Sequence, residues 1–167
     1  MAQRFEPVLK VLTDAGVRYL VVGGVAVVLH GHLRTTGDLD LVVELSPDNL
    51  ARALDALEQA GFQPRPPVSL RSFADPSIRR SWIDTKNLQV FSLWHPELPG
   101  FEVDLFVEEP FDFDQAWGRR VDVVLANTVA TIVGLQDLLE LKRAAGRARD
   151  LEDVAVLEAL AQRSDDD

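Results

Sequence analysis

Two carboxylates, Asp38 and Asp40, stand at the start of a short amphipathic strand. The stretch Tyr19–Glu44 reads YLVVGGVAVVLHGHLRTTGDLDLVVE, which predicts a buried strand, Gly23-Gly24, a short helix, a loop and a second strand. Because side chains alternate along a strand, Asp38 and Asp40 share one face and the intervening leucine faces the other way. Carboxylates this close repel each other unless a divalent metal or an arginine lies between them.

A second amphipathic strand supplies a third carboxylate. In the segment 101–107, Glu102, Asp104 and Phe106 share one face, opposite an apolar face. Magnesium prefers carboxylate oxygens, and two such ions can clamp the attacking and leaving oxygens of a phosphoryl displacement. Asp38, Asp40 and Asp104 have the chemistry for such a site, with Glu102 as a rival to Asp104.

The remaining pattern predicts an α/β (α+β) fold, with a small, mixed, twisted sheet flanked by helices and a helical C-terminal segment. A helix starts at Ser46-Pro47-Asp48, with the serine at its cap, and a long irregular connection covers 63–76. The other predicted elements are a helix over 5–12, strands over 81–85, 88–94, 101–107, 121–125 and 128–133, and a helix over 135–145. We expect a catalytic core over 1–133, a helical segment over 134–163 and an acidic tail over 164–167.

The last predicted helix starts at Asp150-x-x-Asp153, which is typical of a capping box. Its spacing places Leu151, Val154, Leu157 and Leu160 in the core. Asp150 and Asp153 are therefore interpreted first as capping residues.

Composition excludes several classes of protein. The 167 residues carry 17 Lys and Arg against 27 Asp and Glu, and the net charge of −10 argues against a general nucleic-acid or anionic-membrane binder. There is no cysteine, so neither disulfides nor a cysteine zinc site can form, which fits a cytoplasmic protein. No apolar run is long enough to span a bilayer, and the start of the chain lacks the layout of a signal peptide.

The stretch GGVAVVLHGHLRTTGDLDLVV resembles the signature of the DNA polymerase β-like nucleotidyltransferase superfamily. More narrowly, it is similar to a small bacterial group of the form GG-x-A…HG…R-x-T-x-D-x-D, related to AbiEii-type toxin and antibiotic nucleotidyltransferases. The segments FEVDLF and LLELKRAAGRARDLEDV resemble later motifs of these relatives.

The resemblance implies transfer of a nucleoside monophosphate from an NTP, such as ATP, to an acceptor, with release of pyrophosphate. Asp38 and Asp40 match the metal-binding pair, and Asp104 matches a third carboxylate that helps to deprotonate the acceptor hydroxyl. Two Mg²⁺ ions are implied, with Mn²⁺ as an alternative. Gly23 and Gly24 match the nucleotide-positioning turn, and two further residues, Arg34 and Thr36, occupy the segment that would face the triphosphate.

Several assignments stay open at this stage. Arg34 could instead pair with Asp38 or Asp40, and Lys142 could meet a phosphate or pair with Asp150, because a charge on an apolar helix stripe needs a partner. His30 is interpreted as a packed or capping histidine.

The acceptor is not identified, and a small molecule, a protein or RNA all remain open. A homodimer or a partner protein could complete the site. The rival functions are a silent nucleotide- or partner-binding member, such as a toxin–antitoxin component, and a phosphohydrolase with an aspartate nucleophile. The phosphohydrolase is disfavoured because the Asp-x-Asp pair of such enzymes ends a strand, whereas Asp38-Leu39-Asp40 opens one.

Overall fold

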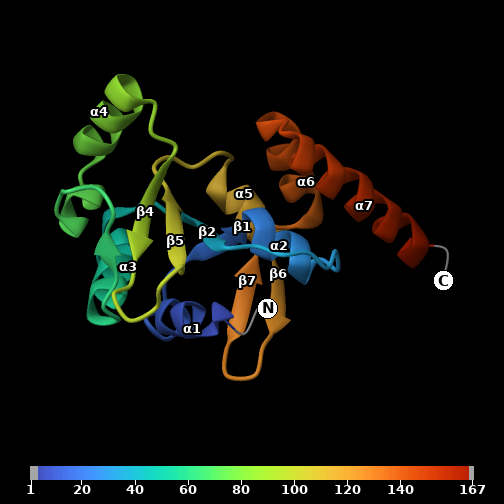
Figure 1. Cartoon of the computed structure of the whole chain (residues 1–167), viewed down its shortest axis with the longest axis horizontal. Coiled ribbons are helices and arrows are strands. Elements are labelled where there is room, and N and C mark those ends of the chain that lie inside the picture. Colours follow the sequence, from blue (N-terminus) through green and yellow to red (C-terminus); the bar gives the residue numbers. More distant parts are fainter. Residues whose placement is uncertain (1–3, 166–167) are drawn as a thin grey trace.

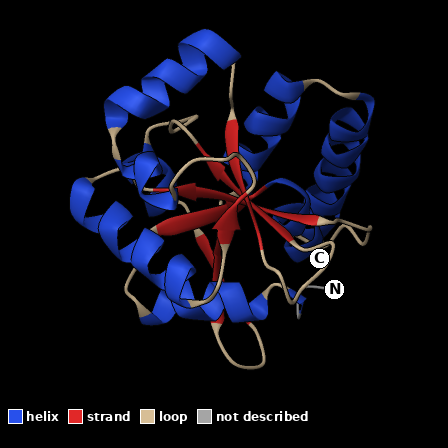
Figure 2. Ribbon diagram, turned by 60° about the vertical axis from the view of Figure 1, so that its left-hand side comes forward, coloured by secondary structure: helices blue, strands red, loops and turns tan. Residues whose placement is uncertain are grey.

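A seven-stranded mixed sheet forms the centre of the protein (Figures 1 and 2). The computed structural model describes residues 4–165, and the order of strands across the sheet is β3-β4-β5-β2-β1-β7-β6. The strands are β1 (Tyr19–Val22), β2 (Asp38–Val43), β3 (Gln63–Pro64), β4 (Val90–Trp94), β5 (Glu102–Phe106), β6 (Val121–Val124) and β7 (Val129–Ile132). The prediction of a mixed sheet flanked by helices is confirmed.

The helices lie around this sheet, with α3 and α4 toward one end and α6 and α7 side by side at the other (Figure 1). They are α1 (Glu6–Asp14), α2 (Gly23–Leu29), α3 (Pro47–Gln59), α4 (Pro76–Lys86), α5 (Phe113–Gly118), α6 (Leu135–Ala145) and α7 (Ala148–Asp165), with a 3₁₀ helix, η2 (Leu70–Ala74). None of the helices within residues 4–165 combines the length and apolar character needed to cross a bilayer.

The central strands follow the predicted alternation. In β2 and β5 the residues Leu39, Leu41, Val103 and Leu105 are fully buried. On the other face Asp38 is exposed and Asp40, Glu102 and Asp104 are partly covered, whereas Val42 further along β2 is buried. β1 is buried on both faces, and β2 and β7 pair with its two edges. The sheet therefore has one closed apolar face and one face that stays partly open around the carboxylates.

The predicted strand over 81–85 is wrong, because these residues belong to α4. Asp75 caps this helix by accepting hydrogen bonds from the backbone N–H groups of Ser77 and Ile78, and Pro76 occupies the first helical position. The ring of Trp82 stacks on Phe91 of β4, with centroids 5.1 Å apart. The helix start at Asp75-Pro76 and the burial of Trp82 thus favour a helix over the weak strand pattern.

Two other segments also differ from their predictions. The connection over 63–76 is not wholly irregular, since it contains β3 and η2. Ser46 stands at the start of α3, but its hydroxyl donates to Glu44 Oε2 and makes no cap bond.

The last helix begins at Ala148, so Asp150 and Asp153 lie within it and are buried, not capping. Its buried stripe runs through Asp150, Asp153, Val154 and Leu157, and the predicted core residue Leu151 is 51% exposed. Asp150 and Asp153 lie on the buried face of α7, because Lys142 and Arg34 neutralise their charges there. Residues 164 and 165 of the predicted tail continue α7, and 166–167 lie outside the described residues.

Candidate active site

Gly23 opens α2 directly after β1 and brings the backbone against a carboxylate. Its φ is +61°, a conformation that L side chains rarely adopt. A Cβ at this position would lie 2.7 Å from Asp40 Cγ and would overlap with Asp40 Oδ2. Asp40 also accepts a hydrogen bond from the backbone N–H of Gly24. Glycine at position 23 is therefore required both by the turn and by the place that Asp40 occupies.

The sheet register brings together residues that are far apart in the sequence. β2 and β5 run parallel, with Asp40 opposite Asp104 and Asp38 opposite Glu102. Residues directly opposite each other on neighbouring strands point to the same face. The structure thus places the three predicted carboxylates on one face of two adjacent strands.

The same register separates Asp104 from its rival. Glu102 is held by Arg65, with 2.6 Å between Arg65 Nε and Glu102 Oε1. Asp104 is held near Ser92 through a side-chain hydrogen bond, yet its Oδ1 is buried without a hydrogen-bond partner. An orphaned carboxylate oxygen beside a second carboxylate favours Asp104 as a ligand for a cation.

Burial and mutual repulsion perturb this pair of acids. Burial, followed by the nearby charges of Asp104 and Asp38, raises the pKa of Asp40 from 3.8 to about 7. Burial likewise raises the pKa of Asp104, although its hydrogen bond with Ser92 opposes this. A bound cation would relieve both effects, because an opposite charge favours the ionised form.

The carboxylates are chemically suited to a magnesium ion, although they do not form a complete set of ligands in this structure. Within residues 4–165, no three His, Asp or Glu side chains are grouped so as to hold a metal ion. The fit rests instead on the Asp40–Asp104 pair, the unpartnered Asp104 Oδ1 and hard oxygen donors that Mg²⁺ prefers.

Arg34 and Thr36 lie against the Gly23-Gly24 turn. A Cβ at Gly24 would overlap with Thr36 Oγ1 and would lie 3.1 Å from an Nη of Arg34. The Arg34 guanidinium does not pair with the β2 carboxylates and contacts Asp153 of α7 instead, with 2.9 Å between Nε and Oδ1. That contact is an ion pair whose geometry does not satisfy Nε as a hydrogen-bond donor.

Lys142 lies in a buried charge cluster between α6 and α7. Its ammonium contacts Asp150 Oδ1 at 2.8 Å and Asp153 Oδ2 at 2.9 Å. Of the two roles considered for Lys142, pairing with Asp150 is observed. Its positive charge also lowers the pKa of Asp40, although less strongly than burial raises it.

His30 is a packed histidine, as its sequence context indicated. Its Nε2 lies 2.8 Å from the carbonyl oxygen of Val133, and burial lowers its pKa. It therefore has a structural contact and no place among the carboxylates.

A cavity of about 490 Å³ opens beside the carboxylates. Gly23 and Asp40 line it together with α6, where Leu138, Leu141, Ala144 and Ala145 provide an apolar wall. Lys142 and Asp150 are charged residues of its lining. Of these lining residues, the sequence reasoning had assigned site roles to Gly23, Asp40 and Lys142. It missed the apolar wall and also Gln89, Phe106 and Arg147. The alternation of β5 was a signal for Phe106, which shares a face with Asp104, but nothing local marked Gln89 or Arg147.

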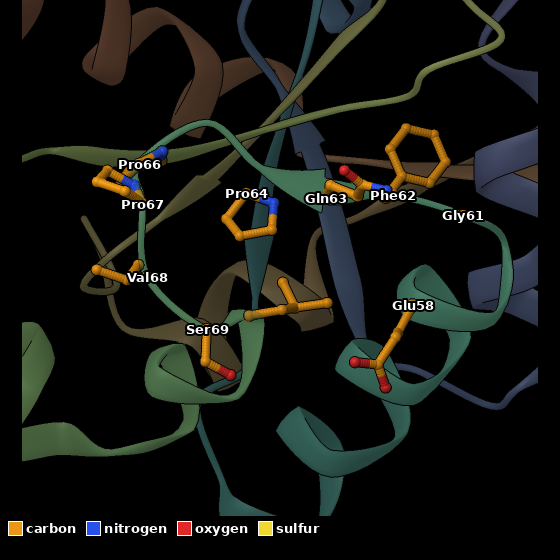
Figure 3. A pocket seen from close by; sticks show the side chains of 10 residues that line it. Glu58, Gly61, Phe62, Gln63, Pro64, Pro66, Pro67, Val68 and Ser69 are labelled. Atoms are coloured by element: carbon orange, nitrogen blue, oxygen red, sulfur yellow. The ribbon is translucent and has the colours of Figure 1, made fainter.

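A second cavity, of about 620 Å³, lies away from these residues (Figure 3). It is formed by Glu58 at the end of α3, the proline-rich segment 64–67 and the start of η2. It is larger, but it contains one carboxylate and none of the predicted site residues. The cavity beside Asp40 is therefore the candidate active site.

A mixed sheet that presents paired carboxylates beside a Gly-Gly turn defines a protein of the DNA polymerase β-like nucleotidyltransferase fold. The chain belongs to the family described as "Nucleotidyltransferase of unknown function (DUF6036)", whose profile matches residues 3–165. The fold is also similar to that of the lincosamide antibiotic adenylyltransferase LnuA, in a lincomycin-bound crystal structure. The TM-score is 0.61 and the identity 14%, over 95% of this chain and 96% of that one. No curated protein matches the sequence.

Proposed function

We propose that the protein transfers a nucleoside monophosphate from an NTP to an acceptor hydroxyl, with Mg²⁺ held by Asp38, Asp40 and Asp104. The observation that carries this proposal is the register of β2 and β5, which sets Asp40 opposite Asp104 beside the Gly23 turn. The family and the fold support nucleotidyl transfer as the reaction class.

The donor nucleotide would occupy the cavity between the carboxylates and α6. Its volume of about 490 Å³ lies within the range of small-molecule sites, which are commonly about 300–1,000 Å³. Phe106 and the apolar wall of α6 suit a base, and the Gly23 turn suits the phosphates.

In the reaction, the acceptor oxygen attacks the α-phosphorus, the bond to the bridging oxygen breaks and pyrophosphate leaves. Asp104 would accept the hydroxyl proton, since burial has raised its pKa and made it a stronger base. When bound, Mg²⁺ would supply positive charge to the phosphate oxygens and to the attacking oxygen.

The experiment is calorimetric binding of non-hydrolysable ATP, GTP, CTP and UTP analogues with and without Mg²⁺. We expect Mg²⁺-dependent binding by the wild type, and its loss in the double variant Asp38→Ala/Asp40→Ala. Asp14→Ala is a matched control, because this carboxylate is exposed and pairs only with Lys10 among the described residues. Metal-independent binding would favour a silent nucleotide-binding protein, and no binding would refute the proposal.

A further inference from the structure

Lys142, one of the residues that the sequence suggested for phosphate binding, is already paired with two carboxylates. Lys142 is only 6% exposed, and its ammonium is shared between two carboxylates that are themselves buried. Moving it toward a phosphate would leave Asp150 and Asp153 with less compensation in the interior, which is costly. Lys142 is thus a fixed counter-charge of the helix pair.

Arg34 is also held by an ion pair. Its side chain is 13% exposed and its guanidinium contacts Asp153 of α7. It holds the loop before β2 against the C-terminal helices, and Arg149 supports this by donating to the carbonyl oxygen of Thr35.

Arg147 differs from both in its exposure and position. It lines the cavity together with Asp40 and Gly23, and its side chain is 78% exposed. The hydrogen bond to Asp150 and the charge of Asp150, followed by that of Asp40, raise the pKa of Arg147, so it stays charged at the site.

Asp150 holds one edge of this guanidinium. Arg147 Nε donates to Asp150 Oδ2 at 2.6 Å, while Asp150 Oδ1 receives the Lys142 ammonium. The two Nη groups have no hydrogen-bond partner among the residues that the structure describes. A guanidinium carries five N–H donors in a planar fork, so four remain on these groups for an anion in the cavity.

The charges around Arg147 leave it available to an anion. In the cluster of α6 and α7, three cations, Arg34, Lys142 and Arg147, contact two carboxylates, Asp150 and Asp153. Asp40 adds a negative charge to the same cavity, which the proposed Mg²⁺ would offset. Arg147 is the exposed cation of the cluster and lines the cavity.

We propose that Arg147 binds the polyphosphate of the donor nucleotide and that Asp150 is its positioning residue. This inference rests on the proposed function and names the residue that distinguishes a triphosphate from a monophosphate. Lys142 acts behind it as a buried counter-charge.

The test compares Mg²⁺-dependent binding of a non-hydrolysable NTP analogue with that of the corresponding NMP. The dissociation constants of both ligands are measured for the wild type, Arg147→Gln and Arg147→Lys. Hydrogen bonds to charged groups contribute enough for a loss of about 10-fold or more. We therefore expect Arg147→Gln to weaken NTP binding by about 10-fold or more and NMP binding by less than about 3-fold. The NTP affinity of Arg147→Lys should lie between those of the wild type and Arg147→Gln, because lysine keeps the positive charge but lacks the planar set of N–H donors.

Arg143→Gln is the matched control. Arg143 belongs to the neighbouring turn of α6, pairs with Glu158 and does not line the cavity. It should leave both dissociation constants unchanged.

Three results would overturn the inference: unchanged NTP affinity in Arg147→Gln, an equal loss for NTP and NMP, or an equal effect of the Arg143 variant. Failure of the wild type to bind any NTP is a separate result, since it refutes the proposed function on which the inference rests.

Discussion

Replacing Asp40 by asparagine should stabilise the metal-free protein at pH 8. The carboxylate has a pKa of about 7 in the folded protein and 3.8 as the reference, because burial and the charges of Asp104 and Asp38 disfavour its ionised form. At about 1.4 kcal/mol for each pH unit between the two values, ionisation costs the folded state about 4 kcal/mol. Asparagine avoids this cost, and its side-chain oxygen can still accept the hydrogen bond from Gly24.

The sign and the pH window follow from proton linkage. A raised pKa means that the folded protein binds more protons than the unfolded chain between pH 3.8 and about 7. The contribution of Asp40 to the free energy of unfolding of the wild type is therefore most favourable in acid, and it is lost as pH rises through this window. The advantage of the asparagine variant should grow from pH 5 to pH 8 by roughly 2–3 kcal/mol and then level off.

The assay is thermal unfolding in EDTA from pH 5 to 8.5, with Asp14→Asn as a control for an exposed carboxylate. For a domain of this size we expect the melting temperature of the variant to exceed that of the wild type by about 10 °C at pH 8. Added Mg²⁺ should narrow the difference, because only the wild type keeps all three carboxylates. A pH-independent difference, or a wild type that is the more stable at pH 8, would refute the reasoning.

Two further perturbations test the turn and the charge cluster. Gly23→Ala should abolish nucleotide binding and cost about 1–3 kcal/mol for its backbone strain, plus the overlap with Asp40. Gly16→Ala measures the cost of backbone strain alone, because its φ is +66° and no atom lies within 4 Å of the added carbon. If both variants lose the same free energy of unfolding in urea, an overlap with Asp40 is excluded. Lys142→Met should cost about 3–5 kcal/mol in the same assay, because it leaves buried carboxylates short of a cation. Lys10→Met removes an exposed pair and should cost less than about 1 kcal/mol, so comparable losses would contradict the buried-cluster interpretation.

Local patterns predicted most elements near the site. The alternation of Asp38-Leu39-Asp40 identified β2 and its polar face, and the predicted helix over 135–145 coincides with α6. Both depend on a period of two or 3.6 residues, which a short segment expresses by itself. The strand over 81–85 failed because a polar, weakly periodic segment was judged without the Asp75-Pro76 helix start before it.

The partners of charged residues were less predictable. Asp150 and Asp153 were interpreted as caps because their spacing is also that of a capping box, whereas the fold buries both against Lys142. No local pattern marked Arg147, because its proposed role comes from lining the same cavity as Asp40.

The sequence by itself determined which faces of the strands are polar, where the Gly-Gly turn lies and that three carboxylates are available. Only the tertiary structure decided that Asp40 pairs in register with Asp104, 64 positions later, and that Arg34 contacts Asp153 instead of the nearby β2 carboxylates. The physical reason is range. Side-chain periodicity is set by the geometry of one segment, whereas strand order and buried ion pairs depend on how the whole chain closes around a common core.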